Sequence, residues 1–218
     1  MPNADPYLAI KINPQFIAFV SLIALLEDYE KQMSTFPKVG SSDELKQATQ
    51  EIALPTITDL LAIRKLIELG FGSTAETLLR TQIERVATIS FLRNHPHKIK
   101  KWVKKGGDVE YLKVRINSML ALKNPLDGKV VLGAHEFTSQ MKDYVDALQA
   151  LVHCNRSGAY VSSFESDEGT VLVAGSNPYN SIQISRVSNY SGQVLCYLIQ
   201  ELNLAFPKLK EYYLGEAA

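Results

Sequence analysis

Residues 73–92 read STAETLLRTQIERVATISFL, and this stretch decides the fold. At about 100° per residue, its apolar side chains cover well over half of a helical circumference. Ser73 and Glu76 have the spacing of a capping box, which predicts where the helix begins. Pro96 requires it to end nearby. We therefore predict a central helix of about twenty residues, enclosed by other parts of the chain.

Apolar residues at helical spacing predict further helices on both sides of the central one. Asn13 and Pro14 are expected to be the N-cap and the first residue of an N-terminal helix. Pro55 is expected to end or kink the helix that reaches it, because proline cannot donate a backbone hydrogen bond. The expected ranges outside the central helix are about 14–36, 43–55, 56–69, 98–105, 109–123, 136–152 and 180–205.

Between the last two expected helices the sequence pattern changes. Residues 159–164 and 170–174 favour β-strands and are separated by a polar turn with glycine, which predicts a small hairpin near residues 159–174. Because no internal repeat, low-complexity tract or flexible linker occurs, residues 1–218 are expected to form a single domain. The predicted class is mainly α, a bundle of about six or seven helices with one hairpin.

Composition excludes several classes of protein. Lys and Arg number 23 and equal the 23 Asp and Glu, so any basic contact surface must be local. Cys154 and Cys196 lack the spacing of a disulfide framework or a zinc site, which favours the cytoplasm. The apolar run at 16–26 is shorter than the about 20 residues of a membrane helix, so no membrane span is expected. No phosphate-binding glycine loop, HExxH or GxSxG occurs, and we expect no metal and no cofactor.

Arg80 and Glu84 stand out on the central helix. They lie one turn apart between apolar neighbours, so at least part of this pair should be buried. A buried charge costs several kcal/mol unless a partner matches it, and two interpretations remain open. The pair is either a structural ion pair between helices, or Glu84 orients Arg80 and leaves guanidinium donors free for a phosphate or carboxylate. Arg85 and Arg93 on the same helix are expected to be solvated.

Two further groups of residues are candidates for chemistry. His153 ends the 136–152 helix and is followed by Asn155 and Arg156, which places a base, an amide and a cation together. The alternative for His153 is a surface or capping role. Trp102 lies among the lysines of the 98–105 segment, which could hold a phosphate backbone beside a stacking ring. The alternative there is a solvated helix face anchored by tryptophan.

The order of these features resembles a bacterial helical domain family of unknown function. Its members carry an Arg-x-x-x-Glu helix, matched here by Arg80 and Glu84, and a later Val-His motif, matched by Val152 and His153. The resemblance covers about 56–205, and the family is distantly similar to the HEPN (higher eukaryotes and prokaryotes nucleotide-binding) superfamily. It implies a helical, homodimeric protein that acts on RNA or a nucleotide, in many relatives as a metal-independent ribonuclease of toxin or phage-defence systems.

This sequence departs from the usual HEPN motif, in which four to six residues separate an arginine from a later histidine on one helix; Arg93 and His97 have three residues between them. No arginine here has a histidine at that spacing. The resemblance therefore implies a site formed from two helices, with catalytic Arg80, Glu84 and His153. Asn155, Arg156 and Trp102 are the expected substrate contacts. The alternative hypothesis is a non-catalytic interaction or dimerisation module in which Arg80 and Glu84 are structural.

Overall fold

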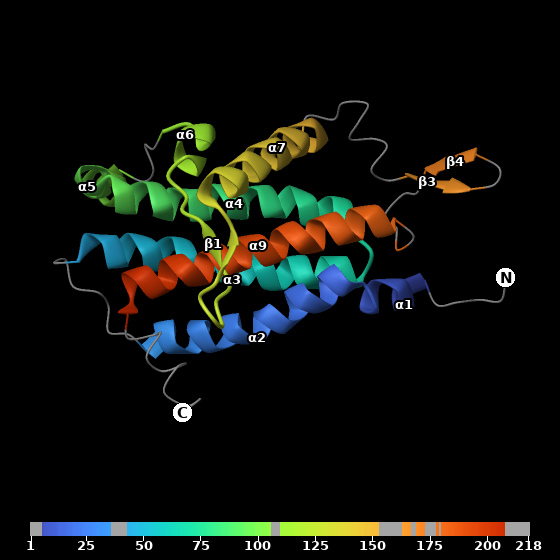
Figure 1. Ribbon diagram of the computed structural model, residues 1–218, viewed down its shortest axis with the longest axis horizontal. Helices are drawn as coiled ribbons and strands as arrows, with labels where there is room; N and C mark the ends of the chain where they lie inside the picture. The colour runs from blue at the N-terminus through green and yellow to red at the C-terminus, as the bar shows by residue number, and fades with distance from the viewer. Residues whose placement is uncertain are drawn as a thin grey trace.

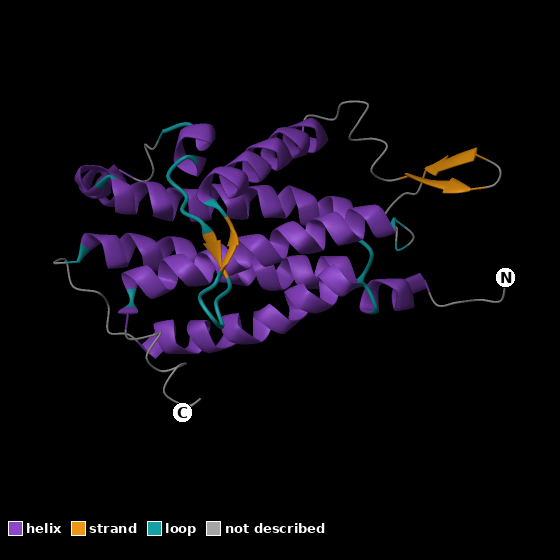
Figure 2. Ribbon diagram, viewed as in Figure 1, coloured by secondary structure: helices purple, strands orange, loops and turns teal. Residues whose placement is uncertain are grey.

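The computed structural model describes residues 6–35, 43–105, 110–152, 163–166, 169–172, 178 and 180–207. These residues form a mainly helical protein with two small hairpins (Figures 1 and 2). The helices are α1 (Pro6–Lys11), α2 (Pro14–Thr35), α3 (Glu44–Glu68), α4 (Gly72–Asn94), α5 (Pro96–Lys105), α6 (Leu112–Ile116), α7 (Ala134–Val152) and α9 (Ser181–Ala205). The strands are β1 (Leu122–Lys123), β2 (Val130–Leu132), β3 (Ser163–Ser166) and β4 (Gly169–Leu172).

The mainly α class and the hairpin near residues 159–174 are confirmed. β3 pairs antiparallel with β4, with Ser163 opposite Leu172. The helices of the described residues number eight; the short α1 is added before the predicted N-terminal helix, and two predicted ranges, 43–55 and 56–69, are joined in α3. In the part of the chain that is described, no helix has both the length and the apolar character needed to cross a membrane.

The central position predicted for residues 73–92 is confirmed. α4 packs against α3, α9, α5, α6 and α7, and every residue from Val86 to Leu92 is buried. Seven consecutive residues point in every direction around a helix, so this second half of α4 lies in the core. Figure 1 shows α2, α3, α4 and α9 along the length of the molecule, with α6 and α7 on the outer side of α4.

The N-terminal helix begins as the sequence predicts. The Asn13 side-chain oxygen accepts hydrogen bonds from the backbone N–H groups of Gln15 and Phe16, both at 3.1 Å. An N-cap of this kind satisfies donors that a helix start otherwise leaves unpaired. The Asn13 amide also donates to Ser185 Oγ at 2.7 Å, which joins the start of α2 to α9. α2 packs along α9 and α3.

The predicted end of a helix at Pro55 is wrong, because α3 runs from Glu44 to Glu68 as one helix. Proline in a helix interior costs about 3 kcal/mol. Ile52, Ile57 and Leu60 lie on both sides of Pro55 and are buried on one face. Burying each such side chain stabilises by about 1.5–3 kcal/mol, so the continuous apolar face outweighs the lost hydrogen bond.

The helix predicted at 109–123 is also wrong beyond its first turns. Of the described residues 110–123, Leu112–Ile116 alone form an α-helix, and β1 then pairs with β2 around a turn. Gly128 in that turn has φ 71°, which a glycine adopts without strain. The Tyr197 hydroxyl accepts from Leu120 N–H at 2.6 Å, so contacts with α9 hold this segment in place of a helix.

Candidate functional site

Arginine–carboxylate contacts lie at four positions along α4, and the geometry of three of them separates structural pairs from a candidate site; the fourth joins Arg85 to Asp59 of α3. Each of the three is named here after one member. The Glu76 cluster contains Glu76 and Arg186, the Arg80 cluster contains Arg80, Glu84 and Arg115, and the Glu201 cluster contains Arg93 and Glu201.

The Glu76 cluster is closed. The Glu76 side chain is fully buried, and its Oε1 accepts from Arg186 Nε at 2.8 Å and from the Tyr144 hydroxyl at 3.3 Å. Gln183 Nε2 donates to Oε2 at 3.0 Å. Burial, with the nearby Glu76 charge, raises the pKa of Tyr144 well above its usual value, so this phenol stays a donor. Both carboxylate oxygens are therefore matched, as a buried charge requires.

The capping box predicted at Ser73 and Glu76 is wrong. α4 begins one residue earlier, at Gly72, and its N-cap residue makes no side-chain hydrogen bond to the helix. Ser73 Oγ instead accepts from Gln183 Nε2 at 3.1 Å. A Cβ at Gly72 would lie 2.7 Å from Gln183 Oε1, so a larger residue here would require the Gln183 side chain to shift from its bonds to Ser73 and Glu76. Both predicted capping residues therefore bind α9.

The Glu201 cluster is closed as well. Arg93 donates from Nε to Glu201 Oε2 at 2.8 Å and from Nη2 to Oε1 at 3.0 Å, and Ser90 Oγ donates to Oε1 at 2.7 Å. The Glu201 side chain has no exposed surface. The prediction that Arg85 and Arg93 are solvated is wrong, because Arg85 Nη1 is also bound, to Asp59 at 2.6 Å. Asp59, the partner of Arg85, lies on α3, and Glu201, the partner of Arg93, lies on α9.

The Arg80 cluster has a different geometry. Arg80 Nη2 lies 3.6 Å from Glu84 Oε1, longer than a hydrogen bond, and the two side chains are 24% and 36% exposed. α6 brings Arg115 to the same face of α4, where its Nη1 donates to Thr88 Oγ1 at 2.6 Å and to the Glu84 carbonyl at 3.2 Å. Two guanidinium groups and one half-exposed carboxylate therefore lie on this face of α4, with Arg115 bound to the Glu84 backbone and not to its carboxylate, and the three charges sum to a positive value.

The Arg80 cluster also lacks hydrogen-bond acceptors for two of its N–H donors. Arg80 Nε and Arg115 Nε are both buried, and neither has a hydrogen-bond partner among the residues described. An unsatisfied buried donor costs about 1–3 kcal/mol and requires an explanation such as a bound water, ion or ligand. Desolvation lowers the pKa of Arg115, and the Glu84 charge acts against this. Unlike the other two clusters, the Arg80 cluster is open.

The remaining predicted catalytic residue, His153, lies outside the described residues, as do Asn155 and Arg156. Tyr144 of α7 contacts Glu76, one turn before Arg80 on α4. Val152 lies eight residues after Tyr144, about 12 Å along the helix axis. Figure 1 shows that α7 runs toward the start of α4 and diverges from it. The described end of α7 therefore leads away from Arg80.

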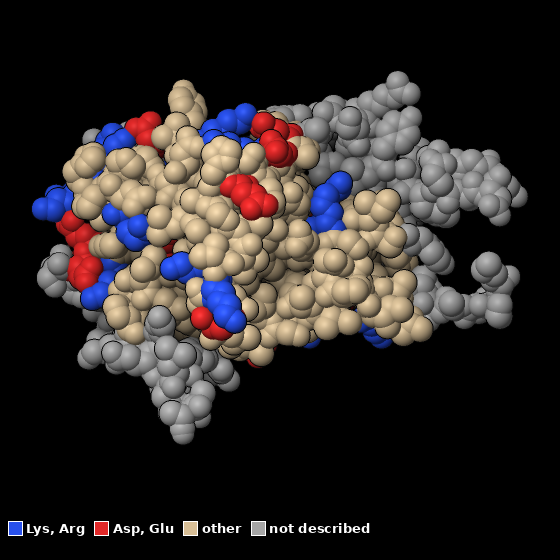
Figure 3. Space-filling model, in the orientation of Figure 1, with Lys and Arg blue, Asp and Glu red and all other residues tan. Residues whose placement is uncertain are grey.

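Trp102, the predicted stacking residue, is half-buried on α5 and packs against the hydrophobic core. Lys98 on the same helix contacts the Glu110 carboxylate and lies 5.1 Å from the centre of the Phe91 ring. Figure 3 shows positive and negative side chains interspersed at the α5 end of the visible face. These contacts favour the anchored helix face, the alternative to a phosphate-binding surface.

Comparison of the chain with family models, with curated proteins and with solved structures found no match. Within the described ranges, no three His, Cys, Asp or Glu side chains are grouped so that they could hold a metal ion. A pair of arginines with free donors can bind a phosphate or carboxylate group. Arg115, which sequence reasoning missed, doubles the positive charge available for this.

Proposed function

We propose that this chain is a HEPN-like helical protein that binds the phosphate groups of RNA or of a nucleotide at the Arg80 cluster. The observation that carries the proposal is the acceptor deficit, with two arginines around one half-exposed carboxylate and two buried N–H groups unpaired. A phosphate oxygen accepts hydrogen bonds from the accessible part of these guanidinium groups and balances the local charge. The resemblance to HEPN proteins supports a cytoplasmic role in a toxin or phage-defence system.

The proposal assigns each residue a role. Arg80 and Arg115 contact the phosphate, and Glu84 orients Arg80 from one turn along α4. In the catalytic form of the proposal, the chain is a metal-independent ribonuclease and His153 is the general acid or base. Asn155 and Arg156 are then substrate contacts. The catalytic form rests on the family resemblance and on the sequence after α7.

Binding is tested with fluorescently labelled single-stranded RNA, with AMP as a competitor, by anisotropy. Arg80→Gln and Arg115→Gln should each weaken RNA binding about tenfold or more, because a charge-assisted contact is lost. The slope of log affinity against log salt should fall by about one for each arginine. Arg64→Gln removes the same charge from α3, where Glu68 binds Arg64 at 2.8 Å, and should leave RNA affinity unchanged.

Two results decide the proposal. Wild-type protein that binds neither RNA nor AMP, or variants at Arg80 and Arg115 that bind like wild type, would end it. The catalytic form is tested separately with a labelled RNA pool. Equal cleavage by wild type and by His153→Ala rejects the catalytic role of that histidine and leaves the binding proposal intact.

A second candidate function is a non-catalytic dimerisation or interaction module. Apolar side chains are exposed at the end of the molecule where α1 and the starts of α2 and α9 meet. Ile12 and Ile182 are 63% and 78% exposed, and Leu8 and Ile17 are about half exposed. The corresponding part of the visible face in Figure 3 carries few charges. Exposed apolar patches with few charges are typical of protein interfaces.

A further inference from the structure

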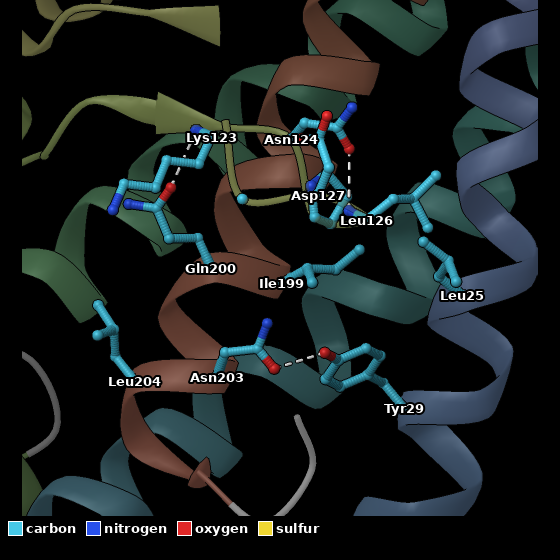
Figure 4. Close-up of a pocket in the computed structure, with 12 residues that line it drawn as sticks. Leu25, Tyr29, Lys123, Asn124, Leu126, Asp127, Ile199, Gln200, Asn203 and Leu204 are labelled. Carbon is cyan, nitrogen blue, oxygen red and sulfur yellow. Dashed lines mark hydrogen bonds between the residues drawn. The ribbon is translucent and has the colours of Figure 1, made fainter. Parts of the chain in front are cut away.

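A pocket of about 350 Å³ lies between α2, α9 and the turn that joins β1 to β2 (Figure 4). None of its lining residues belongs to the Arg80 cluster. Leu25 of α2, Ile199 and Leu204 of α9 and Leu126 of the turn form apolar walls. Leu126 is 65% exposed and Leu204 is 50% exposed, so both side chains have apolar surface that a ligand in this pocket could bury.

The turn is a fixed wall of this pocket. Gly128 N–H donates to the Asn124 carbonyl, and Leu126 N–H donates to the Asn124 side-chain oxygen, both at 2.9 Å. Lys123 N–H donates to Gln200 Oε1 at 3.2 Å, which ties the hairpin to α9. Because these bonds hold the turn before any ligand arrives, little conformational entropy is lost on binding.

One polar group points into the pocket with its orientation fixed. The Tyr29 hydroxyl donates to Asn203 Oδ1 at 2.6 Å, so the Asn203 NH₂ group is turned away from Tyr29, as Figure 4 shows. Asn203 Nδ2 has no acceptor in the described part of the chain. Burial raises the pKa of Tyr29 to about 12, so the phenol keeps its proton and the amide keeps this orientation at neutral pH.

The charged residues of the lining do not select a charged ligand. The Asp127 carboxylate lies 3.5 Å from Lys129 Nζ and accepts from Lys129 N–H at 2.9 Å. In Figure 4 the Lys123 side chain extends past Gln200, away from Ile199 and Asn203. The lining therefore offers apolar surface and neutral amide donors, of which Asn203 lies on α9 between the apolar walls and Gln200 and Asn124 lie at the hairpin, their oxygens bound by the hairpin's own N–H groups.

We propose that this pocket binds a small, uncharged molecule with an apolar body and one carbonyl-type oxygen. The oxygen accepts a hydrogen bond from Asn203 Nδ2, and the body contacts Leu25, Leu126 and Ile199. A volume of 350 Å³ is at the lower end of the roughly 300–1,000 Å³ of small-molecule sites. This site is independent of the phosphate proposal.

The test uses two probes of the same shape, acetophenone and α-methylstyrene, which differ in that a carbonyl oxygen replaces a methylene group. Each is titrated into ¹⁵N-labelled full-length protein while amide resonances are followed by NMR. Acetophenone should give saturable shifts around the pocket and at the Asn203 side-chain NH₂ group. It should bind roughly threefold to tenfold more tightly than α-methylstyrene, the usual range for one neutral hydrogen bond.

Three variants sharpen the test. Asn203→Asp keeps an acceptor for Tyr29 and removes the NH₂ donor, so the preference for acetophenone should disappear. Asn189→Asp makes the same change outside the pocket, and its preference should equal that of wild type. Leu25→Trp fills the pocket from the partly buried face of α2, and neither probe should then bind.

Several outcomes would overturn the proposal. Equal affinity of wild type for both probes removes the role of Asn203, and absence of saturable shifts at the pocket removes the site. If the Asn203→Asp variant still prefers acetophenone, the role of Asn203 is likewise removed. If Asn203→Asp does not fold, the contrast between the two probes on wild type and on Leu25→Trp still decides the matter, since it needs no change at Asn203.

Discussion

At the scale of the residue, the decisive contrast is between Arg93 and Arg80, two arginines on the same helix. Glu201 is fully buried and Arg93 is its only charged partner among the described residues. Removing one partner of a buried pair costs about 3–5 kcal/mol, because the other charge is left without compensation. Arg80 has a half-exposed, loosely held partner, and such pairs contribute about 0–1 kcal/mol.

We therefore expect Arg93→Gln to lower the free energy of unfolding by about 3 kcal/mol or more, and Arg80→Gln by less than about 1 kcal/mol. Urea unfolding followed by circular dichroism measures both. The double variant Arg93→Gln/Glu201→Gln should recover part of the loss, because no unpaired charge remains. An equal loss in Arg80→Gln and Arg93→Gln would mean that the Arg80 cluster is structural.

The same residues show how far a site can be predicted from sequence. Arg80 and Glu84 were found because they are four positions apart, and a helix brings such residues together. Arg115 contacts Glu84 from 31 positions away, and Arg186 reaches Glu76 across 110. No local pattern marks such partners, since they depend on how helices pack. Sequence reasoning therefore identified a pair and missed the residue that makes its charge positive.

At the scale of the element, the start of α3 provides a pH-dependent test. Asp43 caps this helix, with Oδ1 accepting from Lys46 N–H at 3.2 Å and Oδ2 lying 2.6 Å from Lys46 Nζ. The hydrogen bond from the Lys46 side chain lowers the pKa of Asp43 below 3.8. Because the folded pKa is the lower one, the stabilisation is complete above the unfolded pKa and is lost as the pH falls through the folded value.

Asp43→Asn keeps an N-cap acceptor and removes the charge. It should be less stable than wild type by a few tenths of a kcal/mol at pH 7, because Asp43 is partly exposed. The difference should stay constant down to about pH 5 and vanish toward about pH 2. Urea midpoints of both proteins across this range measure it. A difference that grows as the pH falls would contradict the assigned direction of the pKa shift.

Sequence predicts a helix best where one face of that helix is continuously apolar. The N-terminal, central and last helices follow that pattern and were found close to their observed bounds. Local signals failed where packing opposed them. Pro55 lies inside α3 because buried residues continue on both sides of it, and residues 117–123 leave the helix because β1 contacts α9. Tertiary contacts override propensity at both places.

At the scale of the whole molecule, the arrangement separates three surfaces. The Arg80 cluster lies on the side of α4 that α6 covers, and the pocket around Asn203 lies between α2 and α9. The exposed isoleucines lie at the end where α1 contacts α2 and α9. The three proposals, phosphate binding, small-molecule binding and self-association, therefore rest on different residues, and each is tested by substitutions that leave the other two surfaces unchanged.

Self-association at the exposed apolar end is the test of the second candidate function. In a two-fold symmetric dimer every substitution occurs twice, so Ile12→Glu or Ile182→Glu places two new carboxylates in the interface. Each should raise the dimer dissociation constant about tenfold or more, measured by sedimentation equilibrium, because the charges repel and lose water. Val131→Glu puts the same charge on β2, where the side chain is 58% exposed, and should leave the equilibrium unchanged. If wild-type protein stays monomeric at high micromolar concentration, dimerisation is not a function of this end. If such a monomer binds RNA, the Arg80 cluster is sufficient for RNA binding without a dimer.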